Sequence, residues 1–223
     1  MNTSSFGHML ATFCLCAAMG SAQAALIVDT GEPYNPGSGS AIVGQSSGFQ
    51  YQYLANSFTV NQAYRIQSIT THLQFAAPFF NQPGSYAFAV YSDSDGLPGA
   101  RLFTWTDGFV GANEPGGWRG ATSLDWYIDA GRYWVALEGP NSALVAIASG
   151  PGVPLNGTSA YKFGGTGAWG LNASAAYSLR VDAVSVVPEP SSLSLIMVGA
   201  IAMGFLRRRG RHRGFTLSGY ERG

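Results

Sequence analysis

The stretch Ile69-Thr70-Thr71-His72-Leu73-Gln74-Phe75 places Ile69, Thr71, Leu73 and Phe75 at every second position, with more polar residues between them. Because successive side chains of a β-strand point to opposite faces of a sheet, this period of two predicts a strand with one buried face. The same alternation continues outward on both sides, and helical periodicity is nearly absent. Alternating or apolar segments occupy residues 26–29, 56–60, 86–90, 101–105, 124–128, 133–137, 144–148 and 177–183.

Gly- and Pro-rich turn signals separate these segments, at residues 81–84, 95–99, 114–117 and 150–152. About nine or ten short strands at such spacing predict an all-β fold, a single jelly-roll-like β-sandwich over residues 25–187. The Gly-rich residues 31–48 and 150–170 are expected to be long loops over this sandwich.

The composition favours a β protein and argues against nucleic-acid binding. The 223 residues include 30 Gly and 13 Phe, only 11% are charged, and the formal net charge is zero. Such apolar content excludes intrinsic disorder. Residues 25–187 hold ten acidic and six basic side chains. A folded part this acidic lacks the clustered Lys and Arg that phosphate binding needs.

The N-terminal residues 1–24 are predicted to be a secretory signal helix. Residues 9–19 form an apolar run, and Ala22-Gln23-Ala24 gives the small-x-small pattern that signal peptidase reads, with cleavage between Ala24 and Ala25. Cleavage there removes Cys14 and Cys16, the two cysteines of the chain. The mature chain then has no disulfide, thiolate nucleophile or thiolate metal ligand.

The C-terminus has three parts in order. Pro188-Glu189-Pro190 comes first, residues 191–206 carry no charge, and residues 207–213 contain the arginine cluster that begins with Arg207, Arg208 and Arg209. As a helix, residues 191–206 would be about 24 Å long, close to the roughly 30 Å of a bilayer core. They are therefore predicted to form a transmembrane helix with the arginines on the cytoplasmic side.

This tail resembles the PEP-CTERM sorting signal of exported bacterial proteins, also labelled the ice-binding protein C-terminal domain, a label that implies nothing about ice. The resemblance covers residues 188–213 and implies recognition by an exosortase, a membrane-embedded processing enzyme. It also implies anchoring in the inner membrane before sorting, then transfer to the cell surface or the exopolysaccharide matrix. Residues 214–223 extend beyond the family's usual end.

The central region resembles the choice-of-anchor family of exported β-domains. The resemblance rests on residues 54–60 (LANSFTV), 64–69 (YRIQSI), 88–99 (FAVYSDSDGLPG) and 128–137 (IDAGRYWVAL). This family has no established chemistry, so no functional residue is carried over from it.

The catalytic inventory of residues 25–187 is small. Its one histidine, His72, is expected to face solvent from a strand, and a zinc site or a Ser-His-Asp triad lacks partners. Asp125 and Glu138 form a candidate carboxylate pair for glycoside hydrolysis. Asp93 and Asp95 are candidate calcium ligands, although the sequence Asp95-Gly96 is also typical of a hairpin turn. No cofactor is expected.

Trp118 and Trp169, expected in Gly-rich loops, are candidate glycan contacts, since aromatic rings combine an apolar face with a polar edge. The alternative is that their rings cover the ends of the core.

We therefore expect a non-enzymatic, exported surface or matrix protein whose partners are signal peptidase, an exosortase-type enzyme and the membrane. A carbohydrate-binding module of the exopolysaccharide matrix is the first alternative, and a polysaccharide hydrolase is the second.

Overall fold

A computed structural model describes residues 24–44, 51–74, 83–139, 145–153, 157–164 and 166–186. Within these residues, thirteen strands form one antiparallel sheet, and a single 3₁₀ turn covers Ala173–Ala175. The all-β prediction is confirmed. The strands are β1 (Ala25–Asp29), β2 (Gly39–Val43), β3 (Gln52–Val60), β4 (Tyr64–Gln74), β5 (Gly84–Ser94), β6 (Leu97–Val110), β7 (Gly117–Ala121), β8 (Trp126–Ile128), β9 (Gly131–Glu138), β10 (Val145–Ser149), β11 (Ser159–Phe163), β12 (Gly170–Leu171) and β13 (Leu179–Ser185).

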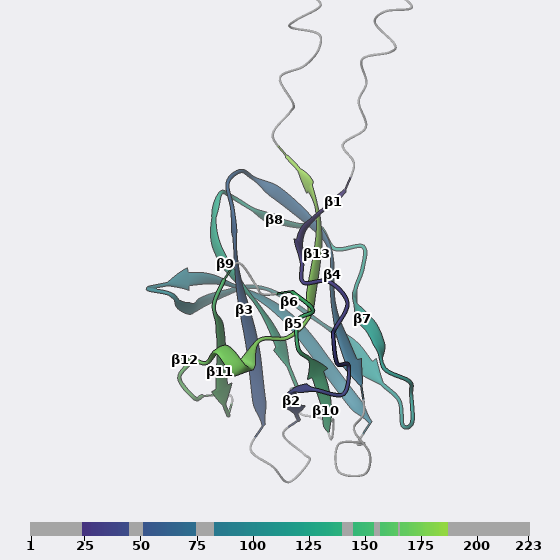
Figure 1. Ribbon diagram of the computed structural model, residues 1–223. Coiled ribbons are helices and arrows are strands. Elements are labelled where there is room, and N and C mark those ends of the chain that lie inside the picture. The colour runs from purple at the N-terminus through teal and green to yellow at the C-terminus, as the bar shows by residue number, and fades with distance from the viewer. Residues whose placement is uncertain are drawn as a thin grey trace, which may run out of the picture. The chain divides into compact units, whose positions relative to one another are not determined.

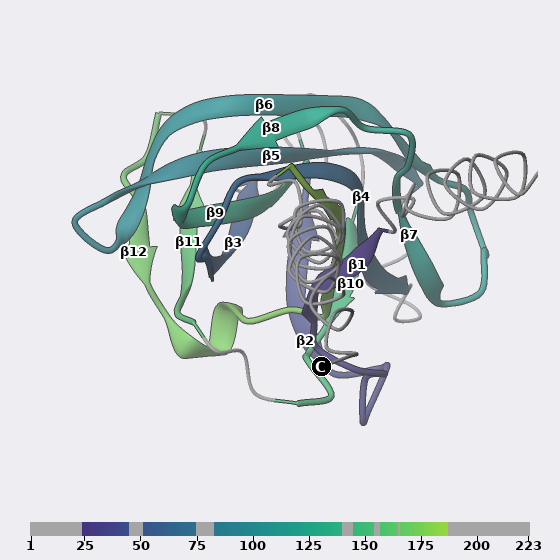
Figure 2. The ribbon, with the colours of Figure 1, turned by 90° about the horizontal axis from the view of Figure 1, so that it is seen from above.

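The sheet folds over into two layers, as the prediction of a β-sandwich requires. In the first layer β4 pairs with β13, β7 and β8, and β13 also pairs with β1. In the second layer β9 lies between β3 and β5, with β6 beyond β5 and with β11 and β12 beyond β3. Strands β2 and β10 connect the layers. Figure 2 shows the strands from above, arranged around the interior of the domain.

The core follows the alternation seen in the sequence. Ile69, Leu73 and the alternating residues of β13 point inward from the first layer, where they meet the inward residues of β3, β5 and β9. Tyr177 crosses this core, because its hydroxyl donates to the Val135 carbonyl (2.8 Å). The fully buried large side chains are Trp134, Tyr177, Phe88, Ile42, Leu54, Ile66, Ile69, Leu73, Ile128, Leu137 and Leu179.

The first and last strands pair with each other and bring the two ends of the domain together. β1 pairs antiparallel with β13, with Ala25 opposite Ala183. On its other side β13 pairs with β4 and ends with Ser185 opposite Tyr64. Figure 1 shows β1 and β13 side by side, reaching the same end of the domain. We call this the exit end.

The second layer is buried on both faces at its centre. A row of alanines crosses its outer face, since Ala160 lies opposite Ala55, Ala55 opposite Ala136, and Ala136 opposite Ala89. All four are fully buried, and Trp169 packs against their cluster. The small side chains leave room for large rings on the outside of the sheet.

Two stretches expected to be loops contain strands. Residues 31–48 include β2, which pairs with β10, and residues 150–170 include β11, which pairs with β3. The expectation was wrong because Gly and Ser conceal the alternation in these short segments, while pairing with neighbouring strands supplies the stability that their sequences lack.

The chain divides into two compact units, of which Ala22–Val187 is the β-domain. The other unit, Met1–Ser21 with Pro188–Gly223, lies outside the described residues. The predicted signal helix and the predicted transmembrane helix 191–206 therefore also lie outside them. In the part that the structure describes, no helix has the length and apolar character needed to cross a membrane.

Two glycines of β7 provide a test of this packing. A Cβ on Gly120 would lie 2.0 Å from the Ile69 carbonyl oxygen of β4, whereas a Cβ on Gly117 would meet nothing within 4 Å. We expect Gly120→Ala to lower the free energy of unfolding by about 1–3 kcal/mol, the usual cost of overpacking. Gly117→Ala, the matched control, should be neutral or slightly stabilising. Urea unfolding of residues 25–187 measures both, and equal effects would contradict the β4–β7 register.

Candidate functional site

The candidate calcium ligands lie at the β5–β6 hairpin. Asp95 and Gly96 have positive φ values of 53° and 81°, as the two central residues of a type I′ turn do. The Asp93 carboxylate accepts hydrogen bonds from the Gly96 backbone N–H (3.1 Å) and the Trp134 indole N–H (2.8 Å). Arg132 lies 3.4 Å from the same carboxylate. Asp93 therefore stabilises the β5–β6 hairpin and connects it to β9. This is the turn that the sequence Asp95-Gly96 predicts.

The described part of the chain contains no cluster of side chains that could hold a metal ion. Nowhere in it do three or more His, Cys, Asp or Glu side chains gather as a metal site would require.

Trp118 lies in β7 rather than in a loop, so its expected position was wrong. Its indole N–H donates to both carboxylate oxygens of Glu32 (2.9 and 3.1 Å). The guanidinium carbon of Arg180 lies 3.8 Å from its ring centroid, and Arg180 also bonds Glu32 (2.7 Å) and Asp29 (3.2 Å). The hydrogen bond from Trp118, followed by that from Arg180, lowers the pKa of Glu32. Because Arg180 covers one face of the indole, that face is closed to a sugar ring.

His72 is buried, contrary to the expectation that it faces solvent. Its side chain is 8% exposed, because β7 pairs beside it and places Trp118 edge-on to its ring at 6.1 Å between centroids. Ser149 Oγ donates to the Pro36 carbonyl (2.7 Å). His72 Nδ1, 2.8 Å from the same Oγ, is therefore the donor in their hydrogen bond. His72 ties β4 to β10 and shows no catalytic arrangement.

Trp169 lies just before β12 and covers the alanine row. Its ring meets Tyr91 edge-on, with 5.7 Å between centroids. The ammonium group of Lys162 lies 5.0 Å from the Trp169 ring and 5.0 Å from the Tyr53 ring. Burial lowers the pKa of Lys162. Trp169 is half-buried as a whole residue and lies beside a cation.

Asp125 and Glu138 are not brought together. Asp125 is exposed on the outer face of the first layer, where it pairs with Arg65 (2.7 Å). Glu138 is buried on the outer face of the second layer, where it accepts hydrogen bonds from Tyr91 (2.6 Å) and Arg101 (2.9 and 3.0 Å). The core lies between the two faces, and packed layers stand about 10 Å apart. The carboxylate pair for glycoside hydrolysis is therefore not formed.

Glu138 belongs to a cluster with Arg101 and Tyr91. Glu138 is a candidate from the sequence, whereas the other two members were not predicted from it. Arg101 Nε donates to the Tyr91 hydroxyl (2.9 Å), which closes a triangle of Arg101, Tyr91 and Glu138. Burial, followed by the hydrogen bond to Glu138, raises the pKa of Tyr91. One feature of the sequence could have indicated this cluster. Arg132 and Glu138 share a face of β9 with the large apolar Trp134, which indicates that this face is covered by other side chains.

A hollow of about 400 Å³ lies between β11, β12 and the 3₁₀ turn. Thr158, Asn172 and Leu171 contribute to its wall together with alanines, and no charged side chain lines it. It offers hydroxyl and amide groups but no acid, base or nucleophile pair.

The sorting-signal residues follow the exit end directly. After β13 ends at Ser185, the Val186 N–H donates to the Ala63 carbonyl (3.1 Å), in the turn between β3 and β4. Pro188, Glu189, Pro190, Arg207, Arg208 and Arg209 lie outside the described residues, as does Ala22. Ala24 is exposed, and Ala25, on the far side of the predicted cleavage bond, is the first residue of β1.

The burial of His72 predicts a pH dependence of stability. Burial lowers the pKa of His72 below its ordinary value of 6.5, Glu32 opposes this, and Arg119 reinforces it. As the pH falls through 6.5, the unfolded chain binds a proton that the folded chain does not, so the free energy of unfolding falls until the lower, folded-state pKa is passed. His72→Asn keeps a donor for Ser149 and should flatten this loss as the pH falls below 6.5. Urea titrations of residues 25–187 at each pH test it, and identical pH slopes would contradict it.

Comparison with known proteins identifies the C-terminal segment. Residues 186–209 match the family described as the PEP-CTERM protein-sorting motif. No curated protein and no solved structure matches the chain. The resemblance of the β-domain to the choice-of-anchor family therefore stays a prediction. The match begins at Val186, the residue that is hydrogen-bonded to the β3–β4 turn. Directly after its last strand, this chain carries the PEP-CTERM sorting signal of an exported protein that an exosortase-type enzyme processes.

Proposed function

We propose that this chain is a non-enzymatic protein of the cell surface or extracellular matrix, exported by its N-terminal signal and held in the membrane by residues 191–206 until it is sorted. The observation that carries the proposal is the sorting motif at residues 186–209, joined without a spacer to a folded β-domain.

The side chains that could have supplied chemistry support a structural role for the domain. Glu138 is neutralised by Arg101, Asp125 pairs with Arg65, and His72 is bonded to Ser149. Each is engaged in holding strands together, and no two of them share a cleft with the spacing that acid–base catalysis needs.

Processing of the tail tests the proposal. In a host that has an exosortase-type enzyme, the wild-type chain should lose its C-terminal segment and leave the membrane fraction. The triple variant Pro188→Ala/Glu189→Ala/Pro190→Ala should keep its full mass and stay with the membrane, because the recognised motif is gone. Intact-mass spectrometry and fractionation with an antibody to residues 25–187 measure both.

Deletion of residues 214–223 provides the control, since these residues lie beyond the motif and their loss should leave processing unchanged. An unprocessed wild-type chain in the cytoplasm would refute the proposal.

Carbohydrate binding is a second candidate, favoured by the half-buried Trp169 beside Lys162. Aromatic faces next to cations suit sugars, above all acidic ones. If this candidate holds, a glycan array should show ligands of the wild-type domain that Trp169→Ala no longer retains. Phe163→Ala removes an exposed ring from neighbouring β11 and should leave them bound. Thermal unfolding confirms that both variants fold, and retention by folded Trp169→Ala would exclude this site.

A further inference from the structure

The distance between the folded domain and the sorting motif is fixed by covalent geometry. Val186 is the last described residue, and its N–H is bonded to Ala63. Pro188 follows two residues later and Glu189 three. Since an extended residue advances at most about 3.3–3.6 Å, Pro188 lies within about 7 Å of Val186 and Glu189 within about 11 Å. An enzyme whose cleft holds this motif must therefore come close to the exit end.

The fold leaves little freedom to lengthen the chain between the folded domain and the sorting motif by releasing residues of β13. β13 is paired on both sides, with β1 and with β4, from Arg180 to Ala183. Leu179, Val181 and Ala183 are fully buried in the core. Beyond Ala183, Val184 pairs with Arg65 and Ser185 pairs with Tyr64 of β4. Withdrawal of more than these residues would break the core.

Exposed apolar side chains gather on the outer face next to this end. Val184 lies opposite Arg65, and Arg65 lies opposite Tyr127 of β8, so these three form one row across the sheet. Leu26 of β1 and Val186 continue this surface, and Leu26, Tyr127 and Val186 are 50%, 45% and 37% exposed. We call Leu26, Arg65, Tyr127, Val184 and Val186 the exit patch.

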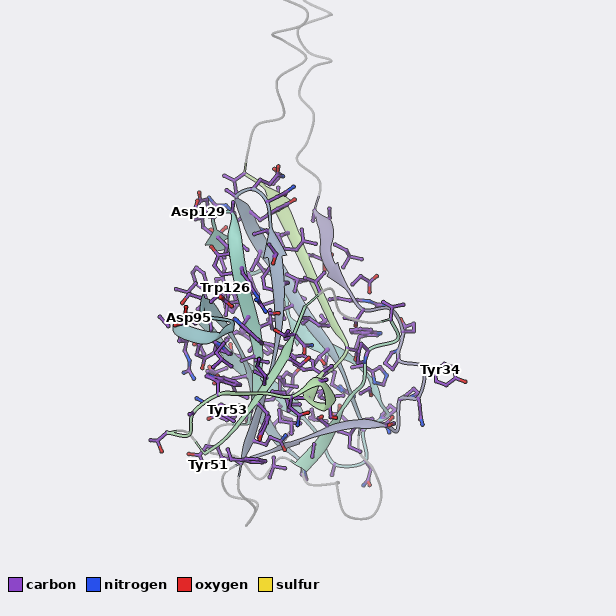
Figure 3. The ribbon with its side chains drawn as sticks, turned by 60° about the vertical axis from the view of Figure 1, so that its left-hand side comes forward. Tyr34, Tyr51, Tyr53, Asp95, Trp126 and Asp129 are labelled. Carbon is purple, nitrogen blue, oxygen red and sulfur yellow. The ribbon has the colours of Figure 1, made fainter. Side chains whose placement is uncertain are left out.

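The charges of the exit patch are already paired. Arg65 binds Asp125 (2.7 Å), and the Tyr127 hydroxyl donates to Asp129 (2.7 Å). Figure 3 shows Asp129 at this end of the domain and Tyr51 toward the opposite end. An apolar surface with neutralised charges and neighbouring carboxylates suits a protein partner better than an anionic lipid surface, which attracts unpaired Lys and Arg.

We propose that the exit patch is the surface on which the processing enzyme rests while it reads the sorting motif. The occupant is this enzyme because the motif is tied to the patch by at most about 11 Å of chain, so one partner must touch both. The inference rests on the proposed function. It adds that the enzyme recognises the folded domain together with the tail.

Two exit-patch variants and a spacer test the proposal. Leu26→Arg and Tyr127→Arg should each slow removal of the tail several-fold, because they place an unpaired charge in the contact. Phe163→Arg is the matched control: it alters an equally exposed aromatic residue on β11 and should leave the rate unchanged. Ten Gly/Ser residues inserted between Val187 and Pro188 add a root-mean-square reach of about 17 Å. With the spacer, the wild-type chain and both patch variants should be processed at equal rates, because the motif then reaches the enzyme without the patch contact.

An engineered disulfide separates docking on the folded end from unravelling of β13. Ser185 and Tyr64 face each other next to the hydrogen-bonded Val186–Ala63 pair, where cross-strand side chains come closest. Tyr64→Cys/Ser185→Cys should form a disulfide after export, since the predicted mature chain has no other cysteine. We expect the disulfide form to be processed like the two single-cysteine variants.

Three results would overturn the proposal: patch variants processed at the wild-type rate, patch variants that stay slower than the wild type when both carry the spacer, or a disulfide form that is not processed. The last would mean that the enzyme needs a frayed strand. If the wild-type chain itself is not processed, the proposed function fails. If the wild-type chain is processed but the patch variants are processed equally fast, only the docking proposal fails.

Discussion

The pairing of β13 between β1 and β4 is the constraint on which much of this structure depends. It connects β1 to the first layer, places Leu179, Val181 and Ala183 in the core, and joins residues about 150 positions apart in the chain. Because the partners are antiparallel, the start of β1 and the end of β13 reach the same end of the domain. The two ends of the β-domain therefore lie side by side, and the sorting motif begins where the sheet ends.

Both outer faces of the sandwich use charged and aromatic side chains for structure. On the first layer, Arg180 covers Trp118 and binds Glu32. On the second, Arg101 and Tyr91 enclose Glu138 above the alanine row. In the second cluster the buried charge of Glu138 is paired with Arg101, as burial in a low-dielectric environment demands. In the described part of the chain, these contacts engage the side chains that could have supplied chemistry, which supports the proposed structural role of the domain.

Local patterns predicted the strands whose alternation is strong, and they failed where Gly interrupts it. β4, β5, β9 and β13 were predicted because each has an apolar face of period two. β2, β7 and β11 were not, because Gly39, Gly117 and Gly120 or short length hide that period. For Gly120, the close approach of the Ile69 carbonyl leaves no space for a Cβ. The need for Gly there arises from a neighbouring strand and leaves no local pattern.

By itself the sequence determined the all-β class and the sorting motif, because periodicity and linear motifs are local properties of the chain. It also predicts a central domain between two terminal signals. Only the tertiary structure decided that His72 is buried, that Trp118 is covered by Arg180, and that Asp125 and Glu138 lie on opposite faces. These facts depend on which distant strands pair and in what register, and a shift of one residue would turn each side chain to the other face.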